Sequence, residues 1–351
     1  MLSYILKRLL LMIPTLFGIL LITFGVIQFV PGGPVEQMVQ TLTRGDQTHA
    51  GEVGQASTLY RGNKGVDPEK LEEIKQLYGF DKPVHERFWK MMTDYVRLDL
   101  GKSFFHNKTV WQLIVEKLPV SISLGLWTFL IAYSVSIPLG IAKAVRHGSH
   151  FDTWTSVAIL VGYAIPGFVL GVALLVVFGG GSFFQVFPLR GLTSDDWAQL
   201  SLLGKVLDYF WHLVLPITCL VLGSFAVNAI LTKNSFLEEI RKQYVLTARA
   251  KGLSERSVLY KHVFRNALVP IITGFPAAFI GAFFTGALLI ETLFSLDGLG
   301  LLSYESVIKR DYPVVMGTLF FFSILGLIAK LLNDVMYVWI DPRVKFERGQ
   351  S

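Results

Sequence analysis

The chain contains six long segments in which charged residues are absent or nearly absent. Each segment is long enough to cross a hydrocarbon layer about 30 Å thick as an α-helix. A helix suits this environment because its backbone groups bond one another where no water is available. We therefore predict an all-α membrane protein with six transmembrane helices. The predicted spans cover residues 9–30, 120–142, 155–178, 209–231, 268–290 and 313–339.

Composition supports a membrane protein. Hydrophobic residues make up 52% of the 351 residues and charged residues only 17%, whereas soluble domains carry about 25% charged residues. Lys7 and Arg8 precede the first span, as in a secretory signal peptide. The apolar run is longer than a signal core, however, and Pro31-Gly-Gly-Pro34 is a poor cleavage site. We expect this segment to be retained as a helix.

The distribution of charge predicts an orientation. The net charge is +6, and the basic excess lies before the first span, in the short loop 143–150, in the loop 233–267 and in the tail. Because basic residues favour the cytoplasmic side, both termini and the loop 233–267 are predicted to be cytoplasmic. This topology accounts for the basic excess, so we predict no nucleic-acid partner.

Four regions follow from this topology. They are a first span (residues 1–30), an outer segment with short helices (31–118), a five-helix core that includes the loop 233–267 (119–340), and a tail (341–351). Within the outer segment, the polar stretch 41–65 is too poor in apolar residues to form a core. Helices are predicted at 67–78, where Asp67 and Pro68 start the first turn, and at 84–98.

Signals for catalysis or metal binding are weak. Cys219 is the only cysteine, and the seven histidines are scattered. Gly101-Lys102-Ser103 resembles the end of a phosphate-binding loop, but Val96 occupies the position of the required first glycine. We predict a non-catalytic chain that binds no metal and no cofactor of its own.

The loop 233–267 is a candidate docking element for a soluble partner. Residues 236–251 lack Gly and Pro and are predicted to form a helix, which Gly252 ends with a left-handed conformation. Ser254 is predicted to cap a second helix that continues to about residue 265. Two helices around a glycine turn would form a compact knob at the membrane surface. A basic helix that binds anionic lipid is the alternative.

The fifth span carries small residues at every fourth position. Gly274, Ala278, Ala282 and Gly286 form one stripe, and such stripes let helices approach closely in lipid. Ordinary packing within the chain would explain the stripe. The functional interpretation places it against a transport pathway or a second copy of a related subunit. Pro276 in this span, and Pro166 beside Gly167 in the third span, are expected to weaken helical hydrogen bonding.

The segment between the fifth and sixth spans is unusually apolar for an outer loop. Phe294 and several leucines surround Gly298 and Gly300, so the loop could fold back over the outer end of a pathway. Its carboxylates could meet basic residues of an outer partner; these are Asp297, Glu305 and Asp311. A loop that simply packs on neighbouring helices is the alternative.

The scarcity of charges within the spans bears on the energy source. Ion-coupled transporters keep ionisable residues at membrane depth, yet the first five predicted spans contain none, and the sixth has only Lys330 and Asp334, four residues apart. We therefore expect the energy source to lie outside this chain. An ion-coupled transporter or channel subunit is the alternative function.

Several motifs resemble the permeases of ABC importers in the dipeptide and oligopeptide family. Thr247-Ala-Arg-Ala-Lys-Gly252 is similar to the ATPase-coupling loop of that family. Residues 233–244 and the enlarged stretch 41–65 are most similar to the Yej-type subfamily, which is associated with peptides and microcin C. Further resemblance lies at residues 4–9, 31–34, 78–83, 118–121, 137–140, 294–300, 310–313 and 341–343.

This resemblance implies a type I importer permease in a bacterial inner membrane, with peptides or peptide-like compounds as substrates. It implies a second homologous permease, two ATP-binding subunits or one fused ATPase, and a periplasmic peptide-binding protein. ATP and Mg would be bound by the ATPase subunits. The apolar outer loop described above is predicted to supply the periplasmic gate or binding-protein contact, formed by Phe294, Asp297, Gly298, Gly300 and Glu305. The coupling residues implied are Thr247, Ala248, Ala250, Lys251, Gly252, Leu253 and Ser254.

Overall fold

The computed structural model describes residues 2–29, 81–179, 183–284 and 287–340. Within these ranges the regular structure is helical, apart from one antiparallel bridge between Lys102 and Thr109. Four helices are long and apolar enough to cross a membrane, and two bent helix pairs raise the number of candidate spans to six. The structure therefore supports an all-α membrane protein with four to six candidate spans, and the predicted six is the upper value. The predictions for residues 41–65, 67–78, Gly286 and 341–351 lie outside the described ranges.

The chain divides into two compact units, and each is described by itself. The first unit combines residues 1–116 with residues 302–324. The second combines residues 117–301 with residues 325–351.

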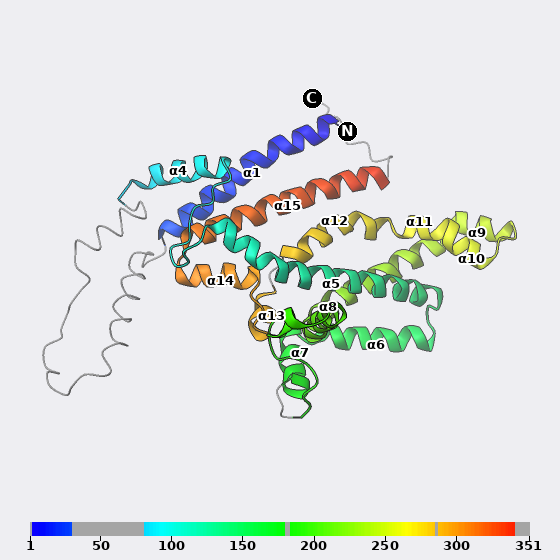
Figure 1. Cartoon of the computed structure of the whole chain (residues 1–351). Coiled ribbons are helices and arrows are strands. Elements are labelled where there is room, and N and C mark those ends of the chain that lie inside the picture. Colours follow the sequence, from blue (N-terminus) through cyan, green and yellow to red (C-terminus); the bar gives the residue numbers. More distant parts are fainter. Residues whose placement is uncertain (1, 30–80, 180–182, 285–286, 341–351) are drawn as a thin grey trace. The chain divides into compact units, whose positions relative to one another are not determined.

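In the first unit, α1 (Leu2–Phe29) and α4 (Val84–Val96) lie side by side (Figure 1). They pack through aromatic rings. The ring of Phe88 lies 5.8 Å from that of Phe17 and 5.2 Å from that of Phe24, measured between centroids. The guanidinium of Arg87 donates to Gln28 Oε1 at 2.8 Å. The predicted helix at 84–98 is confirmed to within two residues, and its apolar stripe packs as an amphipathic helix requires.

The far end of α4 packs on the start of α15 (Tyr312–Ile340) within the same unit. Tyr95 is buried, and its ring lies 4.9 Å from that of Phe320. The backbones come close at Gly317, where a Cβ would lie 2.6 Å from a methyl group of Val110. Aromatic contacts and the close approach at Gly317 therefore both contribute to the packing of this unit.

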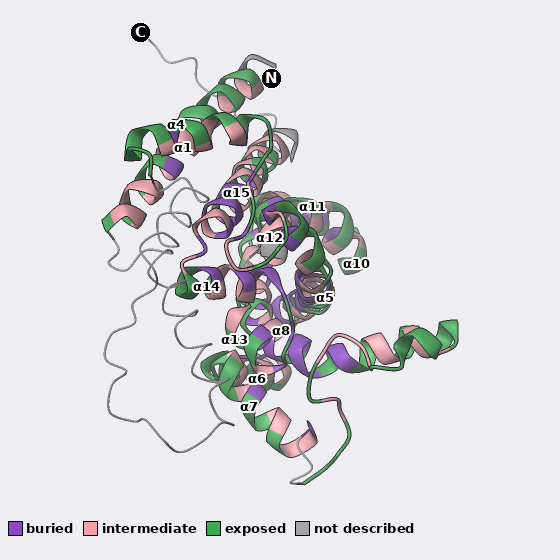
Figure 2. Ribbon diagram, turned by 60° about the vertical axis from the view of Figure 1, so that its left-hand side comes forward, coloured by how far each residue is buried: buried purple, intermediate pink, exposed green. Residues whose placement is uncertain are grey.

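The second unit is built around α5 (Val110–Val145) and α8 (Leu202–Ile240), on which many of its buried residues lie (Figure 2). The two helices meet at Gly140, where a Cβ would lie 2.6 Å from Thr232 Cβ and 2.8 Å from the Ala229 carbonyl oxygen. A core of the second unit lies further along these two helices and draws on several elements; its members include Leu124, Leu213, Leu215, Ile217, Cys219, Ile290, Phe294 and Leu296.

The third span is bent. Its first part is α6 (His150–Ala164). Its second part is α7 (Gly167–Leu174), which continues as a π-helical turn, η1 (Leu175–Gly179). The chain bends by 89° between the first part and the second. The break falls at Pro166, where the predicted weakening of the helix is confirmed. A Cβ at Gly167 would lie 2.8 Å from the Cys219 carbonyl oxygen, so the bend brings α7 against the backbone of α8. A short 3-10 turn, η2 (Trp197–Gln199), precedes α8.

The fifth span is also interrupted. α12 (Val269–Phe284) follows the helical segment 255–267 with a bend of 50°. After α12, the predicted outer loop 291–312 contains two helices, α13 (Leu288–Leu293) and α14 (Leu299–Lys309). The turn between these two helices belongs to the second unit.

Candidate functional site: a knob, a cavity and a closing segment

The knob, defined here as residues 243–267, folds around the end of α8. It contains α9 (Gln243–Ala250), α10 (Glu255–Ser257), a π-helical turn η3 (Val258–Val263) and α11 (Phe264–Ala267). Phe236, on the last turns of α8, is completely buried and contributes to a core that belongs to the knob and the neighbouring helix ends. The other buried members are Ala144, Val245, Ala248, Val258, Val263 and Ala267.

The predicted helix 236–251 is wrong in one respect, because α8 already includes Phe236 and ends at Ile240. The chain turns at Lys242, whose ψ of 151° is extended. Glu239 holds this turn: its carboxylate pairs with Lys242 and accepts from the Tyr244 hydroxyl at 2.6 Å. The turn lets α9 bury Val245 and Ala248 against α8. No Gly or Pro marks the break, so tertiary packing overrides local helix propensity.

Electrostatics at this turn follow from the same contacts. The hydrogen bond to Glu239 raises the pKa of Lys242, so its ammonium group stays charged. Burial and the bond to Glu239 raise the pKa of the Tyr244 phenol, so it remains a donor. The Asn266 side chain donates to the Tyr244 oxygen at 3.2 Å. Tyr244 thus joins the two halves of the knob through polar contacts.

The glycine turn of the knob is confirmed. Gly252 has a φ of +80°, which favours glycine, and the Ser254 hydroxyl caps the second helix by accepting from the Ser257 N–H. Arg249 and Glu255 clasp the turn through two hydrogen bonds, at 2.8 and 3.0 Å. The π-helical geometry of η3 was not predicted, and the sequence carries no local signal for it.

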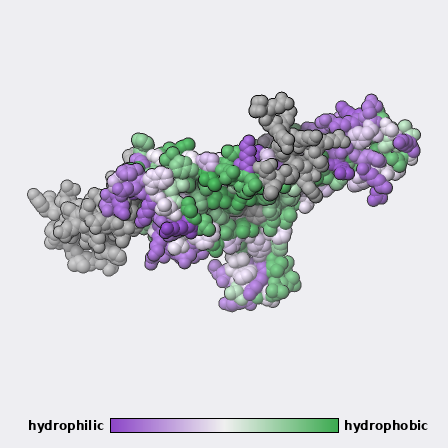
Figure 3. Space-filling view, turned by 90° about the horizontal axis from the view of Figure 1, so that it is seen from above, coloured by the Kyte–Doolittle hydropathy of each residue, from purple (hydrophilic) through white to green (hydrophobic). Residues whose placement is uncertain are grey.

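Most of the predicted coupling residues form the outer surface of the knob. Ala248 is the exception, because only 5% of its surface is exposed and it belongs to the knob's core. The right-hand end of Figure 3, where the knob lies, is mainly hydrophilic. The exposed predicted residues are Thr247, Ala250, Lys251, Gly252, Leu253 and Ser254.

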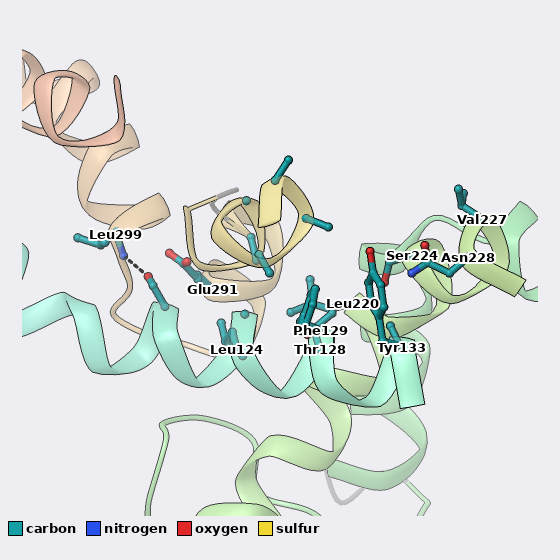
Figure 4. Close-up of a pocket in the computed structure, with 18 residues that line it drawn as sticks. Leu124, Thr128, Phe129, Tyr133, Leu220, Ser224, Val227, Asn228, Glu291 and Leu299 are labelled. Atoms are coloured by element: carbon teal, nitrogen blue, oxygen red, sulfur yellow. Dashed lines mark hydrogen bonds between the residues drawn. The ribbon is translucent and has the colours of Figure 1, made fainter. Parts of the chain in front are cut away.

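A cavity of about 560 Å³ lies in the second unit, between α5, α8, α12 and α13. Figure 4 shows Phe129 and Tyr133 rising from α5, with Ser224 and Asn228 on α8. The lining is mostly apolar, with a few neutral polar groups and the carboxyl group of Glu291. Its members are Ser121, Leu124, Gly125, Thr128, Phe129, Ala132, Tyr133, Leu220, Ser224, Val227, Asn228, Ala277, Ala278, Gly281, Ala282, Ala287, Glu291 and Leu299.

The structure places the members of the predicted stripe of small residues in different environments. Ala278 and Ala282 line the cavity, together with Gly281. Gly274 is exposed, and a Cβ there would meet nothing within 4 Å. Gly286 lies outside the described residues. The pathway interpretation therefore applies to two of the four positions, and it stays a prediction.

One end of the cavity is bordered by the closing segment, defined here as residues 294–301. Phe294 and Gly298 lie in the interior, with 2% of Phe294 exposed. Asp297 has an exposed side chain and pairs with Lys117 of α5. Gly300 is half-buried at the start of α14. Of the predicted gate residues in this segment, Asp297 therefore presents an exposed side chain, and Phe294 packs on neighbouring helices.

In the first unit, the proposed partner contact at Asp311 needs correction. Only 2% of Asp311 is exposed, and its carboxylate accepts from the Ser103 hydroxyl and, at 3.0 Å, from the Phe104 N–H. Burial raises the pKa of this carboxyl. It is therefore committed to its own chain. Glu305, by contrast, is 45% exposed and pairs with Lys309 at 2.6 Å.

Sequence reasoning missed Glu291, which is buried beside the cavity with 1% of its surface exposed. Its Oε2 accepts from the Leu301 N–H at 2.7 Å, and the Gly300 N–H is a second donor. Burial raises the pKa of the Glu291 carboxyl, and these two donors oppose that rise. A signal was present in the sequence: a lone carboxylate at the end of an apolar span.

Sequence reasoning also missed an ion cluster formed by Lys143, Asp152 and Lys233. The Asp152 carboxylate lies 3.1 Å from the Lys143 ammonium and 2.7 Å from that of Lys233. Lys143 is 1% exposed, and it also donates to Thr155 and Ser156. The cluster ties the end of α5 and the start of α6 to α8. Its members lie just outside the predicted uncharged spans.

A cavity between spanning helices, with a hydrophilic knob on one of them, is typical of membrane transport subunits. Residues 136–346 match the family model of the binding-protein-dependent transport system inner membrane component, and residues 53–125 match the model of the N-terminal part of such components. The chain belongs to this family. It is the multi-pass, non-catalytic permease subunit of an ABC importer of the inner membrane, and partner ATPases hydrolyse the ATP.

The chain is similar to curated proteins over nearly its whole length. It is 57% identical to the peptidoglycan transport system permease protein YejB of Agrobacterium fabrum, covering 99% of both chains. It is 51% identical to the inner membrane ABC transporter permease protein YejB of Escherichia coli O157:H7, covering 98% of this chain and 99% of that one. It is 32% identical to the di/tripeptide transport system permease protein DppB of Pseudomonas aeruginosa, covering 99% of this chain and all of that one.

Among solved structures, an inward-facing MetNI methionine ABC transporter matches 66% of this chain and 97% of that chain, with a TM-score of 0.46 and 16% identity. This likeness is too weak to carry an argument. The resemblance to peptide permeases noted above is confirmed by the curated relatives, and the family decides for an ABC importer over an ion-coupled transporter or channel.

Proposed function

We propose that this permease imports peptides or peptide-like compounds and that its knob transmits the cycle of the ATPases to the cavity. One observation carries the proposal: α8 is a single helix that lines the cavity and also packs into the core beneath the knob. Asn228 borders the cavity, and Phe236, eight residues later, is buried in the knob's core. At 1.5 Å per residue the two are separated by about 12 Å along the axis.

A second connection runs through α12. Ala267 is buried in the knob, and Ala278 lines the cavity after the bend between α11 and α12. A force on the knob would therefore reach two walls of the cavity through continuous backbone. Gly252 and the Arg249–Glu255 clasp would keep the knob rigid while it moves.

The proposed substrate class is peptides. It rests on the printed names of the relatives, which include a di/tripeptide permease and a peptidoglycan permease. The cavity suits such substrates, because aromatic rings and neutral polar groups can contact a peptide main chain without selecting one charge. The association with microcin C stays a prediction.

The proposed assembly includes a second homologous permease, two ATP-binding subunits or one fused ATPase, and a periplasmic peptide-binding protein. The family implies ATPase and substrate-binding partners, and the second permease and the stoichiometry are our proposal. Both termini and the knob are proposed to be cytoplasmic, with Asp297 and Glu305 on the opposite side. ATP and Mg would be bound by the ATPase subunits alone.

Site-directed crosslinking tests this arrangement. Single cysteines would replace Ser254, Asp297 or Glu305 in a background in which Cys219 is replaced. We expect the cysteine at 254 to crosslink to an ATPase subunit and those at 297 and 305 to crosslink to the binding protein. Ala248→Cys is the matched control, because it lies in the knob but is buried. A crosslink from position 305 to the ATPase would overturn the orientation.

A further inference from the structure

The closing segment meets the cavity through three consecutive backbone N–H groups at the start of α14. The Leu299 N–H donates to the Ser121 hydroxyl of α5 at 2.9 Å. The next two, from Gly300 and Leu301, donate to the carboxylate of Glu291 on α13. The first N–H groups of a helix lack partners within the helix. Here two different walls of the cavity supply those partners.

Gly298 is required for this arrangement because of space. A Cβ at this position would lie 2.6 Å from both the carboxyl carbon and Oε1 of Glu291. The main chain also contributes, because the Leu296 N–H donates to the Glu291 carbonyl oxygen at 2.7 Å. The closing segment therefore wraps the Glu291 side chain, which is only 1% exposed.

Three neighbouring contacts hold the segment in place. Asp297 pairs with Lys117 on α5. Phe294 and Leu296 enter the core of the second unit. Of the two acidic residues at the segment, Asp297 has an exposed side chain, whereas the Glu291 side chain is buried. Figure 4 shows Glu291 between the start of α14 and the α5 wall, with the Ser121–Leu299 hydrogen bond dashed.

We propose that Glu291 is the positioning residue of a lock that keeps this end of the cavity closed. Its carboxylate holds the start of α14 against α13, and Ser121 holds the same turn against α5. Opening this end for substrate requires the N–H donors of residues 299–301 to leave those acceptors. The lock deepens the proposed function, because it assigns the group that must release before a substrate can enter.

Cavity accessibility tests the lock independently of transport. The complete complex would carry Ala282→Cys in the cavity wall, in a background in which Cys219 is replaced. A membrane-impermeant maleimide would be added from the periplasmic side in the absence of ATP, and the rate of labelling would be measured. Removing a charge-assisted hydrogen bond should shift the closed-to-open equilibrium by about tenfold or more. We therefore expect Glu291→Ala to speed labelling by about tenfold.

Milder variants keep the experiment decisive if Glu291→Ala fails to assemble. Ser121→Ala removes one acceptor, and Glu291→Gln keeps a carbonyl acceptor without charge, so both should give intermediate labelling rates. Glu116→Gln is the matched control, since it removes an exposed carboxylate of a surface pair with Lys108. Assembly is checked by copurification of the ATPase subunit.

Labelling that does occur, but at the same rate as with Glu291 intact, in assembled Glu291→Ala would overturn the lock and leave Glu291 as a cap for α14. If Glu291→Ala does not assemble, the same result in Ser121→Ala and Glu291→Gln would overturn it. Failure of the proposed function looks different. In that case, position 282 would not be labelled from either side in any variant, and changes in the knob would leave ATP hydrolysis coupled to substrate.

Discussion

The carboxylate of Asp152, at the start of α6, lies 2.7 Å from the ammonium group of Lys233 on α8. The same carboxylate lies 3.1 Å from Lys143, which is 1% exposed. One carboxylate therefore pairs with two ammonium groups and joins three helices. Lys233 precedes Phe236, which packs in the core beneath the knob, by less than one turn of α8. The cluster therefore fixes the helix that we propose transmits motion.

Asp152→Asn should destabilise the folded permease strongly. It leaves the buried Lys143 without an anion, and breaking a buried ion pair by removing one partner typically costs about 3–5 kcal/mol. Thermal unfolding of the purified protein in detergent would measure the loss. Glu305→Gln, in an exposed pair with Lys309, should cost no more than about 1 kcal/mol. Equal melting temperatures for the two variants would contradict this account.

Gly252→Val should uncouple ATP hydrolysis from substrate while leaving the complex assembled. A β-branched residue at a φ of +80° is strained by roughly 1 kcal/mol or more, although a Cβ there would meet nothing within 4 Å. Substrate-stimulated ATPase activity is the measurement. Gly101→Val is the matched control, since Gly101 has a φ of +79° in a loop far from the knob in sequence, which we predict to lie on the outer side. Wild-type transport by Gly252→Val would refute the coupling role of the knob.

Ala278→Leu should reduce peptide uptake by about tenfold, because added bulk in a packed wall costs about 1–3 kcal/mol. Ala282→Leu should act similarly, since both residues line the cavity. Gly274→Leu is the comparison on the same helix, where a Cβ would meet nothing within 4 Å. Uptake into vesicles containing the complex would decide. Equal uptake by all three variants would remove these alanines from the pathway.

Gly140→Ala should destabilise the crossing of α5 and α8. The added methyl group would lie 2.6 Å from Thr232 Cβ and 2.8 Å from the Ala229 carbonyl oxygen, and overpacking of this kind costs about 1–3 kcal/mol. Gly223→Ala, in an open part of α8, should instead be neutral or stabilising by up to about 1 kcal/mol. Unfolding in denaturant distinguishes the two. Equal stability would mean that the helices can separate at no cost.

Much of the fold could be predicted from the sequence because hydrophobicity and chain stiffness act locally. Apolar length determined the six spans, and Pro166 marked the bend in the third. Gly252 and Ser254 determined the turn of the knob, since a left-handed glycine and a capping hydroxyl depend on few neighbours. Motifs in the loop and near both ends determined the family.

Only the tertiary structure decided what the charged and small residues do. The turn at Lys242 carries no local signal, and it exists because α9 gains burial against Phe236. Asp152 and Lys233 are 81 residues apart in sequence, so their pairing depends on helix packing. Glu291 looked like the first residue of an outer loop, yet a folded-back turn buries it and supplies its donors. Helix and turn propensities act over a few neighbouring residues. Whether a charged side chain can be buried depends instead on hydrogen-bond partners that only the folded chain brings next to it.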